Sequence, residues 1–268
     1  MAKVRMGMVG GGEGAFIGGI HRMAAAMDGE IELVCGAFSG DPERSARSGA
    51  MLYLEPERIY GDYRQMMSAE AALPADQRMQ FVAIVTPNDL HFPVAEAALG
   101  AGFHVLSDKP ATLSLAQALQ LRERVRDSGL LYGLTHTYTG YPLVKEARER
   151  ISRGELGKIR KVVVEYTQGW LADRQEDLGN KQASWRLNPA QAGVSSCMGD
   201  IGVHAANLAE YVSGLNITEV CADLSAFVEG RELDDDGSIL LRLERGAKGV
   251  LMASQVCVGE ENALSLRI

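Results

Sequence analysis

The sequence predicts an α/β protein with two domains. These are a doubly wound parallel sheet in residues 1–136 and an α+β domain with an open, mostly antiparallel sheet in residues 137–268. In the first half, short and nearly all-apolar runs alternate with helical patterns, which is typical of strands covered on both faces. After about His136, a long alternating strand is followed by further strands with few helices between them. This second pattern favours an antiparallel sheet covered on one face.

Five apolar runs are the expected strands of the N-terminal sheet, and a helix that opens at about Ala15 follows the first of them. A later helix shows both of its ends, because Ser114 and Gln117 form a capping box and Gly129 fits just past the last turn. The expected strands span residues 4–9, 31–38, 81–85, 103–106 and 130–134. The expected buried face of the later helix comprises Leu115, Ala118 and Leu119.

The C-terminal half opens with an amphipathic helix over residues 142–152, and Gly154 follows its end. The strands that we expect after it span residues 159–167, a run near 220, and residues 238–243, 249–256 and 262–268. The last run stops without a turn or a tail. We therefore expect the chain to be a truncated form of a longer protein, with an incomplete second domain.

Composition limits the classes of partner. The net charge of -8 argues against nucleic acid, because phosphate binding needs a basic surface. No stretch approaches the ~20 apolar residues of a membrane helix, and the first residues lack a secretory leader, so we expect a cytoplasmic protein. The cysteines are too widely spaced for a zinc site or a disulfide framework, which favours a reducing compartment. They are Cys35, Cys197, Cys221 and Cys257.

A glycine-rich turn follows the first strand. Gly10, Gly12 and Ala15 match the pattern GxGxxG/A, in which the glycines permit a tight turn and a close approach of backbone to a pyrophosphate. The third small residue lets the helix pack on the strand, so that the helix N-terminus faces the phosphates. The alternative is a glycine-rich loop without a ligand. We predict a dinucleotide-binding Rossmann domain, with Gly14 and Phe16 completing the cofactor-binding turn.

The end of the second strand bears on the choice of cofactor. The acid that binds the ribose hydroxyl of NAD is missing there, whereas Ser39 and Arg44 could accept the 2′-phosphate of NADP. Alternatively, Asp41 caps the next helix, Pro42 occupies its first position and Arg44 is solvated. Both interpretations can hold together. We expect NAD(P) as the cofactor and favour NADP.

Three residues are candidates for acid–base and electrostatic catalysis. Lys109 follows the expected fourth strand, at the edge of the sheet where ligands bind, and could polarise a substrate oxygen. The alternative is a solvated surface turn. Asp200 and His204 lie four residues apart, on one face of an expected helix, and a histidine held by a carboxylate is a suitable base for a hydroxyl proton. Alternatives for this pair are a helix cap with a packed histidine, or a metal site, which needs more ligands than the pair offers.

Taken together, these motifs resemble the glucose–fructose oxidoreductase/inositol dehydrogenase family, often called Gfo/Idh/MocA. The similarity spans nearly the whole chain, and its order and spacing are more specific than any single piece. The motifs that carry it are the glycine turn, Thr86-Pro87-Asn88 with His91, Asp108-Lys109-Pro110, Trp185-Arg186, and Asp200 with His204.

The resemblance implies catalytic roles for Lys109, Asp200 and His204, and a C-terminal sheet that binds substrate and forms a homodimer or homotetramer. It also implies a cis peptide before Pro110. The implied cofactor contacts are Thr86, Pro87, Asn88, His91, Asp108, Lys109 and Pro110. Two departures are Asp108, where the family has glutamate, and the run 193–199, which puts the shape of the pocket in doubt. Family members usually exceed ~300 residues in length, which agrees with the expected truncation.

The functional hypothesis is hydride transfer between a sugar or cyclic polyol and the nicotinamide. His204 exchanges the hydroxyl proton, Asp200 orients His204 or holds the substrate, and Lys109 polarises the reacting oxygen. Tyr138 and Arg186 are further candidates for substrate contact, although packing or surface roles are equally open to them. We expect no metal. The alternatives are a non-catalytic NAD(P)-binding regulator and a glycosidase that retains its cofactor.

Overall fold

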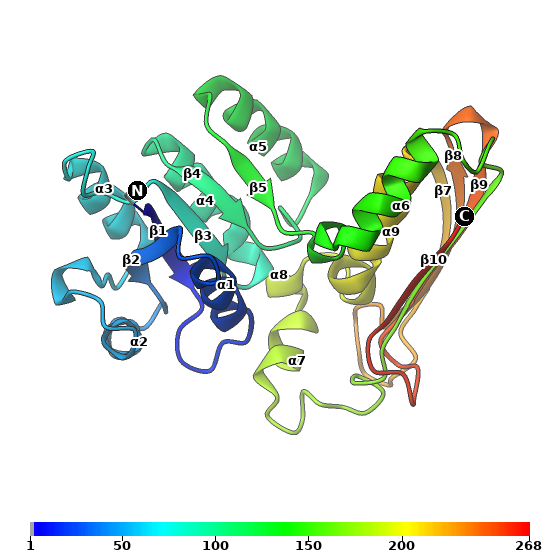
Figure 1. The fold of residues 1–268 in the computed structure, drawn as a ribbon. Helices are drawn as coiled ribbons and strands as arrows, with labels where there is room; N and C mark the ends of the chain where they lie inside the picture. The colour runs from blue at the N-terminus through cyan, green and yellow to red at the C-terminus, as the bar shows by residue number, and fades with distance from the viewer. Residues whose placement is uncertain (1–2) are drawn as a thin grey trace. The chain divides into compact units, whose positions relative to one another are not determined.

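The computed structural model describes residues 3–268; Met1 and Ala2, which begin the expected N-terminal domain, lie outside the described residues. The chain folds into two compact units, of which the first ends at Thr135 and the second begins at His136 (Figure 1). Each unit has its own sheet, helices and hydrophobic core.

The first unit is built on a parallel sheet of five strands in the order β2-β1-β3-β4-β5. All of its pairings are parallel, which confirms the predicted doubly wound sheet. The strand order reverses between β1 and β3, and ligands bind at the carboxyl ends of strands beside such a reversal. The strands are β1 (Val4–Gly10), β2 (Ile31–Ala37), β3 (Phe81–Val85), β4 (His104–Ser107) and β5 (Tyr132–Leu134).

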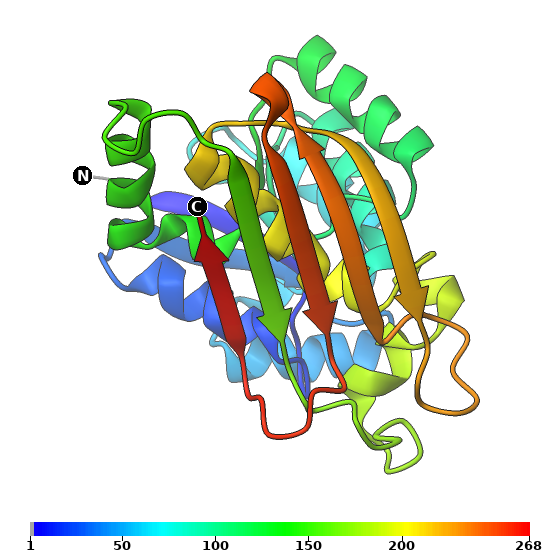
Figure 2. The same ribbon diagram turned by 90° about the vertical axis from the view of Figure 1, so that its right-hand side faces the viewer.

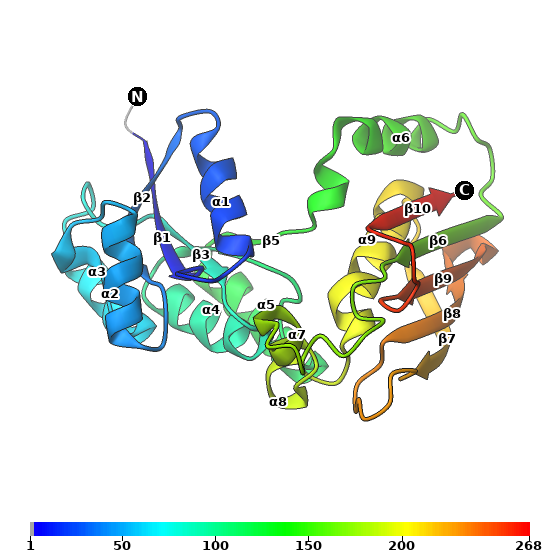
Figure 3. The same cartoon turned by 90° about the horizontal axis from the view of Figure 1, so that it is seen from below.

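Helices cover both faces of this sheet. Val82 and Ile84 face a core shared with helices α3, α4 and α5, whereas Ala83 and Val85 face a second core shared with α1. In Figure 3, α1 accordingly lies on the opposite side of the sheet from α3 and α4. Alternate residues of an extended strand point to opposite faces, so two apolar faces require the unbroken apolar runs seen in the sequence. The helices are α1 (Ile17–Ala26), α2 (Pro42–Met51), α3 (Tyr63–Ala72), α4 (His91–Gly100) and α5 (Leu115–Ser128).

Helix α5 has the predicted ends but a different buried face. Ser114 Oγ accepts a hydrogen bond from Gln117 N, and Gly129 ends the helix with φ 66°. The predicted apolar face is wrong, because Leu115 is 75% exposed. Leu119 is exposed too, and the buried stripe runs through Leu121 and Val125, which pack into the core beside α4. Leu115 lies in the first turn of α5, before the part of the helix that packs against α4. Its side chain is therefore exposed although it is apolar.

The second unit is built on the predicted open sheet. Its five strands run in the order β10-β6-β9-β8-β7 and lie side by side in Figure 2. Only β6 and β9 are paired in parallel, so the sheet is mostly antiparallel, as predicted. The strands are β6 (Lys161–Thr167), β7 (Ile217–Ser225), β8 (Asp236–Leu243), β9 (Lys248–Ser254) and β10 (Ala263–Arg267).

Helix α9 covers one face of this sheet. Val162, Val164 and Leu251 of the strands pack with Ala205 and Ala209 of α9, while the opposite face is open in the described part of the unit (Figure 2). None of the helices in residues 3–268 is long and apolar enough to cross a membrane. The helices of this unit are α6 (Pro142–Ser152), α7 (Lys181–Arg186), α8 (Pro189–Ala192) and α9 (Val203–Ser213), with a π-helical turn at Met198–Gly202.

Candidate active site

The turn after β1 has the backbone that a phosphate-binding loop needs. Gly10, Gly11 and Gly14 have φ values of 82°, 73° and 73°, in the left-handed region that favours glycine. A Cβ atom on Gly10 would lie 2.8 Å from the carbonyl oxygen of Val85, and one on Gly12 would lie 2.8 Å from that of Phe38. Side chains are therefore excluded from this turn, and its backbone is left bare.

The residue that allows helix α1 to pack closely on the glycine turn differs from the predicted one. Ala15 lies before helix α1 and donates its N–H to Gly12 O within the turn, so it is not the packing residue of the motif. That role falls to Gly18, where a Cβ atom would lie 2.4 Å from the Cα atom of Gly11. Gly18 was missed because the pattern was already complete at Ala15. A second pair of glycines, Gly18-Gly19, inside a helical segment was the available signal.

The start of α1 fits the phosphates of a dinucleotide. The helix has ten residues, and the residue before it, Phe16, supplies no side-chain cap, so the first-turn amides keep their donor capacity. Thr86 Oγ1, just after β3, is buried and has no hydrogen-bond partner among residues 3–268. A bare glycine turn, uncapped amides and this hydroxyl are the features that a bound cofactor would use, so the residues present fit NAD(P). The exposed ring of Phe16 flanks the same turn.

The end of β2 has the local structure that the sequence predicted. Asp41 caps helix α2 by accepting hydrogen bonds from Glu43 N and Arg44 N, and Pro42 occupies the first position. Ser39 Oγ accepts a hydrogen bond from Asp41 N, and the side chain of Arg44 is exposed. The cap thus fixes the backbone that carries Ser39 and Arg44 and leaves the guanidinium in solvent.

His91 joins the loops that follow β3 and β4. Its ring nitrogens lie 3.0 Å from Thr86 O and 2.6 Å from Pro110 O, and the side chain is buried. Burial lowers the pKa of His91 despite the pull of the two carbonyl groups. Sequence reasoning assigned this residue to direct cofactor contact. Both ring nitrogens face protein carbonyls, so His91 braces the two loops. Pro87 and the buried Asn88 lie in the first of these loops.

The turn that carries Lys109 is held by its neighbour Asp108. Asp108 Oδ1 accepts hydrogen bonds from Lys109 N at 2.7 Å and Thr135 Oγ1 at 3.2 Å, and Oδ2 lies 3.8 Å from Nε2 of His21. Burial works to raise the pKa of Asp108, but the nearby His21 and Lys109 outweigh it and lower the pKa. The peptide between Lys109 and Pro110 is cis, which confirms the expectation. His21, on α1, was missed because nothing near it in the sequence marks a contact with Asp108.

In the second unit, Asp200 lies within the π-helical turn Met198–Gly202 rather than at the start of an α-helix. The turn continues directly into α9, so the hydrogen bonding between Asp200 and His204 differs from that of the regular α-helix that the sequence predicted. Asp200 Oδ2 lies 3.2 Å from Arg186 Nε and 3.0 Å from Gln255 Nε2. The structure thus places Arg186, a predicted substrate residue, beside Asp200.

Asp234 fixes the segment that leads into this turn. Its carboxylate accepts hydrogen bonds from Ser196 N at 2.9 Å, Met198 N at 2.8 Å and Ser195 Oγ at 3.1 Å. It therefore caps the π-helical turn from a distant point in the chain. Sequence reasoning missed Asp234, because a cap supplied across 36 residues leaves no local pattern.

The ring of His204 lies among other aromatic side chains. It packs edge-to-face against Tyr138 at 4.9 Å and His136 at 5.6 Å between ring centroids, and it is 9% exposed. The hydroxyls of Tyr138 and Tyr166 are hydrogen-bonded to each other. Burial, with Tyr138 as a second cause, raises the pKa of Tyr166 and keeps it neutral. The structure thus brings the predicted residues Tyr138 and His204 together.

These features define a nucleotide-binding α/β protein with a cluster of ionisable and amide side chains in its second unit. Two family models match the chain. "Oxidoreductase family, NAD-binding Rossmann fold" matches residues 4–136, and "GFO/IDH/MocA C-terminal domain" matches residues 144–268. The chain therefore belongs to the GFO/IDH/MocA family of NAD-binding oxidoreductases, which confirms the resemblance and the Rossmann fold.

Individual relatives support this assignment. The uncharacterized oxidoreductase YfiI of Bacillus subtilis is 32% identical over 99% of this chain and 68% of its own. Levoglucosan dehydrogenase of Pseudarthrobacter phenanthrenivorans is 30% identical over 93% of this chain and 61% of its own. An inositol dehydrogenase homolog of Azotobacter vinelandii was solved with NAD+ (TM-score 0.95, 37% identity) and with NADH and myo-inositol (TM-score 0.91, 36% identity). Both structures match 99% of this chain, which spans 68% and 67% of theirs.

Proposed function

We propose that this protein is an NAD(P)-dependent dehydrogenase that acts on a CH–OH group of a sugar or cyclic polyol. The observation that carries the proposal is the match of nearly the whole chain to the inositol dehydrogenase homolog solved with NADH and myo-inositol. The similarity to levoglucosan dehydrogenase, which acts on a sugar derivative, supports the same class of substrate. The glycine turn and the Asp200 cluster supply the cofactor fit and the polar groups that such a reaction needs.

The proposed roles follow from the chemistry of each side chain. His204 exchanges the hydroxyl proton, since an imidazole titrates near neutral pH. Asp200, held by Arg186 and Gln255, offers a carboxylate as a fixed hydrogen-bond acceptor for the substrate or for His204. Lys109, on the turn fixed by Asp108, stabilises negative charge on the reacting oxygen. The nicotinamide, when bound, exchanges the hydride with the carbon that carries this oxygen.

The proposed cofactor preference is NADP. It rests on Ser39 and Arg44 at the end of β2, where no acid is present to bind a ribose hydroxyl. The homolog from Azotobacter vinelandii was solved with NAD+, so the preference needs a direct test. Arg44→Ala should weaken NADP binding by about tenfold and leave NAD binding unchanged. Arg124→Ala, which removes an exposed arginine from α5, should change neither. Equal effects on both cofactors in titrations by nicotinamide fluorescence would remove Arg44 from 2′-phosphate recognition.

The experiment that tests the function is a screen of aldoses, inositols and keto-sugars with each cofactor, followed by the absorbance of reduced nicotinamide. Cofactor-dependent turnover of a panel member supports the dehydrogenase. Tightly held cofactor and glycoside cleavage without a net change in absorbance would favour the cofactor-retaining glycosidase. Cofactor binding without any turnover would favour the non-catalytic regulator.

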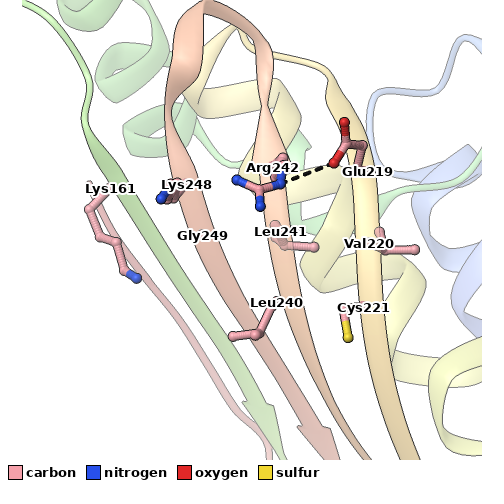
Figure 4. A pocket seen from close by; sticks show the side chains of 9 residues that line it. All are labelled: Lys161, Glu219, Val220, Cys221, Leu240, Leu241, Arg242, Lys248 and Gly249. Atoms are coloured by element: carbon pink, nitrogen blue, oxygen red, sulfur yellow. Dashed lines mark ion pairs between the residues drawn. The ribbon is translucent and has the colours of Figure 1, made fainter.

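We further propose that the open face of the second sheet joins two copies of the chain. The register places Lys161, Lys248, Arg242 and Glu219 in one row with a net positive charge, in which Arg242 pairs with Glu219 at 3.0 Å. Glu165 and Asp223 lie in a row nearer the other end of the strands. Between these rows, the same face carries Val163, Val250 and the exposed Leu240, with the exposed Arg267 of β10 beside Val163 at the edge of the sheet. Lys161, Lys248 and Arg242 line a hollow of about 390 Å³ on this sheet. Figure 4 shows these three side chains and the ion pair of Arg242 with Glu219.

The charges of this face complement those of a second copy. A two-fold axis running across the strands would stack each basic row on an acidic row of the partner, with the apolar middle rows in contact. A two-fold axis along the strands would place like charges together. The charge pattern therefore favours an isologous dimer with antiparallel stacked strands.

A further inference from the structure

Three amide side chains gather at one end of the second sheet. Gln168 and Gln255 each lie one residue beyond the end of a strand, β6 and β9, and Asn262 lies one residue before the start of β10. Gln255 Nε2 lies 3.0 Å from Asp200 Oδ2 and 3.4 Å from Gln168 Oε1, and Gln168 Nε2 donates to Asn262 Oδ1 at 2.7 Å. Because β6, β9 and β10 are neighbours in the sheet, the amides form one continuous row beside Asp200.

Two groups with a single hydrogen-bonding role fix the orientation of this row. The indole Nε1 of Trp170 can only donate, and it lies 3.0 Å from Gln168 Oε1, so the amino group of Gln168 must face Asn262. An ionised Asp200 can only accept, so the amino group of Gln255 must face the carboxylate. Reversing either amide would place two acceptors together. The row therefore has one self-consistent direction.

The same row reaches the surroundings of His204. Tyr166 donates its hydroxyl hydrogen to Asn262 Oδ1 at 2.7 Å and shares a hydrogen bond with the hydroxyl of Tyr138. The ring of Tyr138 packs against His204. Hydrogen bonds and one ring contact thus link Asp200 to His204 through side chains from three strand ends.

We propose that Gln255 is a positioning residue of the active site, which holds the Asp200 carboxylate as an ionised acceptor and ties it to the Tyr138–His204 pair through Gln168 and Asn262. This rests on the proposed function, because it assigns Gln255 to the reaction in which Asp200 and His204 take part. Gln255 is fully buried, so its amide is shielded from competing water, and its amino group donates to Asp200 Oδ2 and, at the longer distance, to Gln168 Oε1. A neutral donor suits this position, since an acid there would compete with Asp200 for a proton.

Arg186 lies within ion-pair distance of Asp200, and Tyr166 and Cys197 are titratable groups whose pKa the Asp200 carboxylate influences. Burial raises the pKa of both Tyr166 and Cys197, so these two groups stay neutral over the range in which the protein would be assayed. His204 is present in every variant, so the difference between each variant and wild type is the relevant measurement.

The test is the near-isosteric variant Gln255→Glu, compared with Gln255→Met and with Gln80→Glu. The new carboxyl in Gln255→Glu faces Asp200 Oδ2 and Gln168 Oε1, which are both acceptors, so it must retain a proton to make either contact. Gln255→Met keeps the length of the side chain but has no donor. Gln80→Glu introduces the same charge at an exposed position in the first unit.

We expect kcat/KM of Gln255→Glu to fall relative to wild type as pH rises from about 6 to 9, because the proton that bridges the carboxyls is lost. Gln255→Met should lose about tenfold to a hundredfold in kcat at every pH, with little change in cofactor affinity. Gln80→Glu should follow wild type. A Gln255→Glu profile parallel to wild type, or a Gln255→Met variant with wild-type kcat, overturns the proposal.

Thermal unfolding of the same variants, without substrate, separates this proposal from the proposed function. A carboxyl with a folded-state pKa raised above about 4.3 loses stability as pH rises, because the folded state binds more protons than the unfolded state. The Tm of Gln255→Glu should therefore fall further below that of wild type with increasing pH. If wild type turns over no sugar or polyol, the proposed function fails, and this Tm difference still decides whether Gln255 faces an ionised Asp200. A pH-independent difference overturns the positioning role.

Discussion

Contacts made by the neighbouring Asp108 fix the backbone conformation at Lys109. Asp108 accepts from the amide of Lys109 and from Thr135 Oγ1, and its second oxygen faces His21 of α1. A catalytic side chain gains from such support, because only a fixed donor stabilises charge without reorganising during the reaction. His21 also links the turn of Lys109 to the helix whose N-terminus fits the cofactor phosphates.

The first prediction concerns Lys109 itself. Lys109→Ala should leave cofactor binding nearly intact and reduce kcat by about 10²–10³, because it removes a charged donor to the reacting oxygen. The exposed Lys145 on α6 provides a control, and Lys145→Ala should keep wild-type kcat. Steady-state kinetics and cofactor titration measure the two effects separately. Unchanged turnover in Lys109→Ala would exclude the lysine from the chemistry.

A second prediction follows from the lowered pKa of Asp108. The pKa of an unfolded aspartate is about 3.9, so the ionised carboxylate contributes stability above that pH and loses it as pH falls through the lower folded-state pKa. Asp108→Asn keeps the shape and the acceptor oxygen but cannot ionise. In urea unfolding, the stability gap between wild type and this variant should be largest above about pH 5 and shrink below about pH 4. A gap that does not change with pH would contradict this account.

At the scale of elements, the sequence predicted the strands and helix ends, because interactions between residues close in the chain determine them. The apolar runs of the first unit became its five parallel strands, and Ser114, Gly129 and Asp41 ended or began their helices as expected. The face that α5 buries could not be predicted in the same way, because it depends on where α4 lies. Contacts between distant segments left no local trace. Gln255 beside Asp200 and Asp234 beneath the π-helical turn are both of this kind.

The contact between α1 and the glycine turn gives the third prediction. Gly18→Ala should weaken NAD(P) binding and destabilise the first unit by about 1–3 kcal/mol, because its Cβ would overlap Gly11. Gly19 is the matched control. A Cβ there meets nothing closer than Arg22 Nη2 at 3.9 Å, so Gly19→Ala should be neutral or stabilising by about 0.5–1 kcal/mol. Thermal unfolding with and without cofactor measures both effects, and equal behaviour of the two variants would disprove the packing role of Gly18.

At the scale of the whole molecule, the open sheet of the second unit is the interface that we propose between two copies of the chain. Charged side chains on such a face hinder edge and face association unless a partner matches them. Here the basic and acidic rows lie at different levels along the strands, with Val163, Val250 and Leu240 between them. This arrangement of rows is complementary to that of a second copy rotated about a two-fold axis that runs across the strands.

The last prediction is therefore that analytical ultracentrifugation at micromolar concentration gives a molar mass twice that of one chain. Leu240→Asp should shift it to the mass of a single chain, because a carboxylate would be buried without a partner in the middle row. Leu143→Asp on α6 makes the same change at another exposed leucine, 82% accessible and away from the sheet, and should leave the mass unchanged. Raising the salt concentration should weaken a dimer held by the outer rows, since it screens their charges. A wild-type protein of single-chain mass at every concentration tested would rule out this interface.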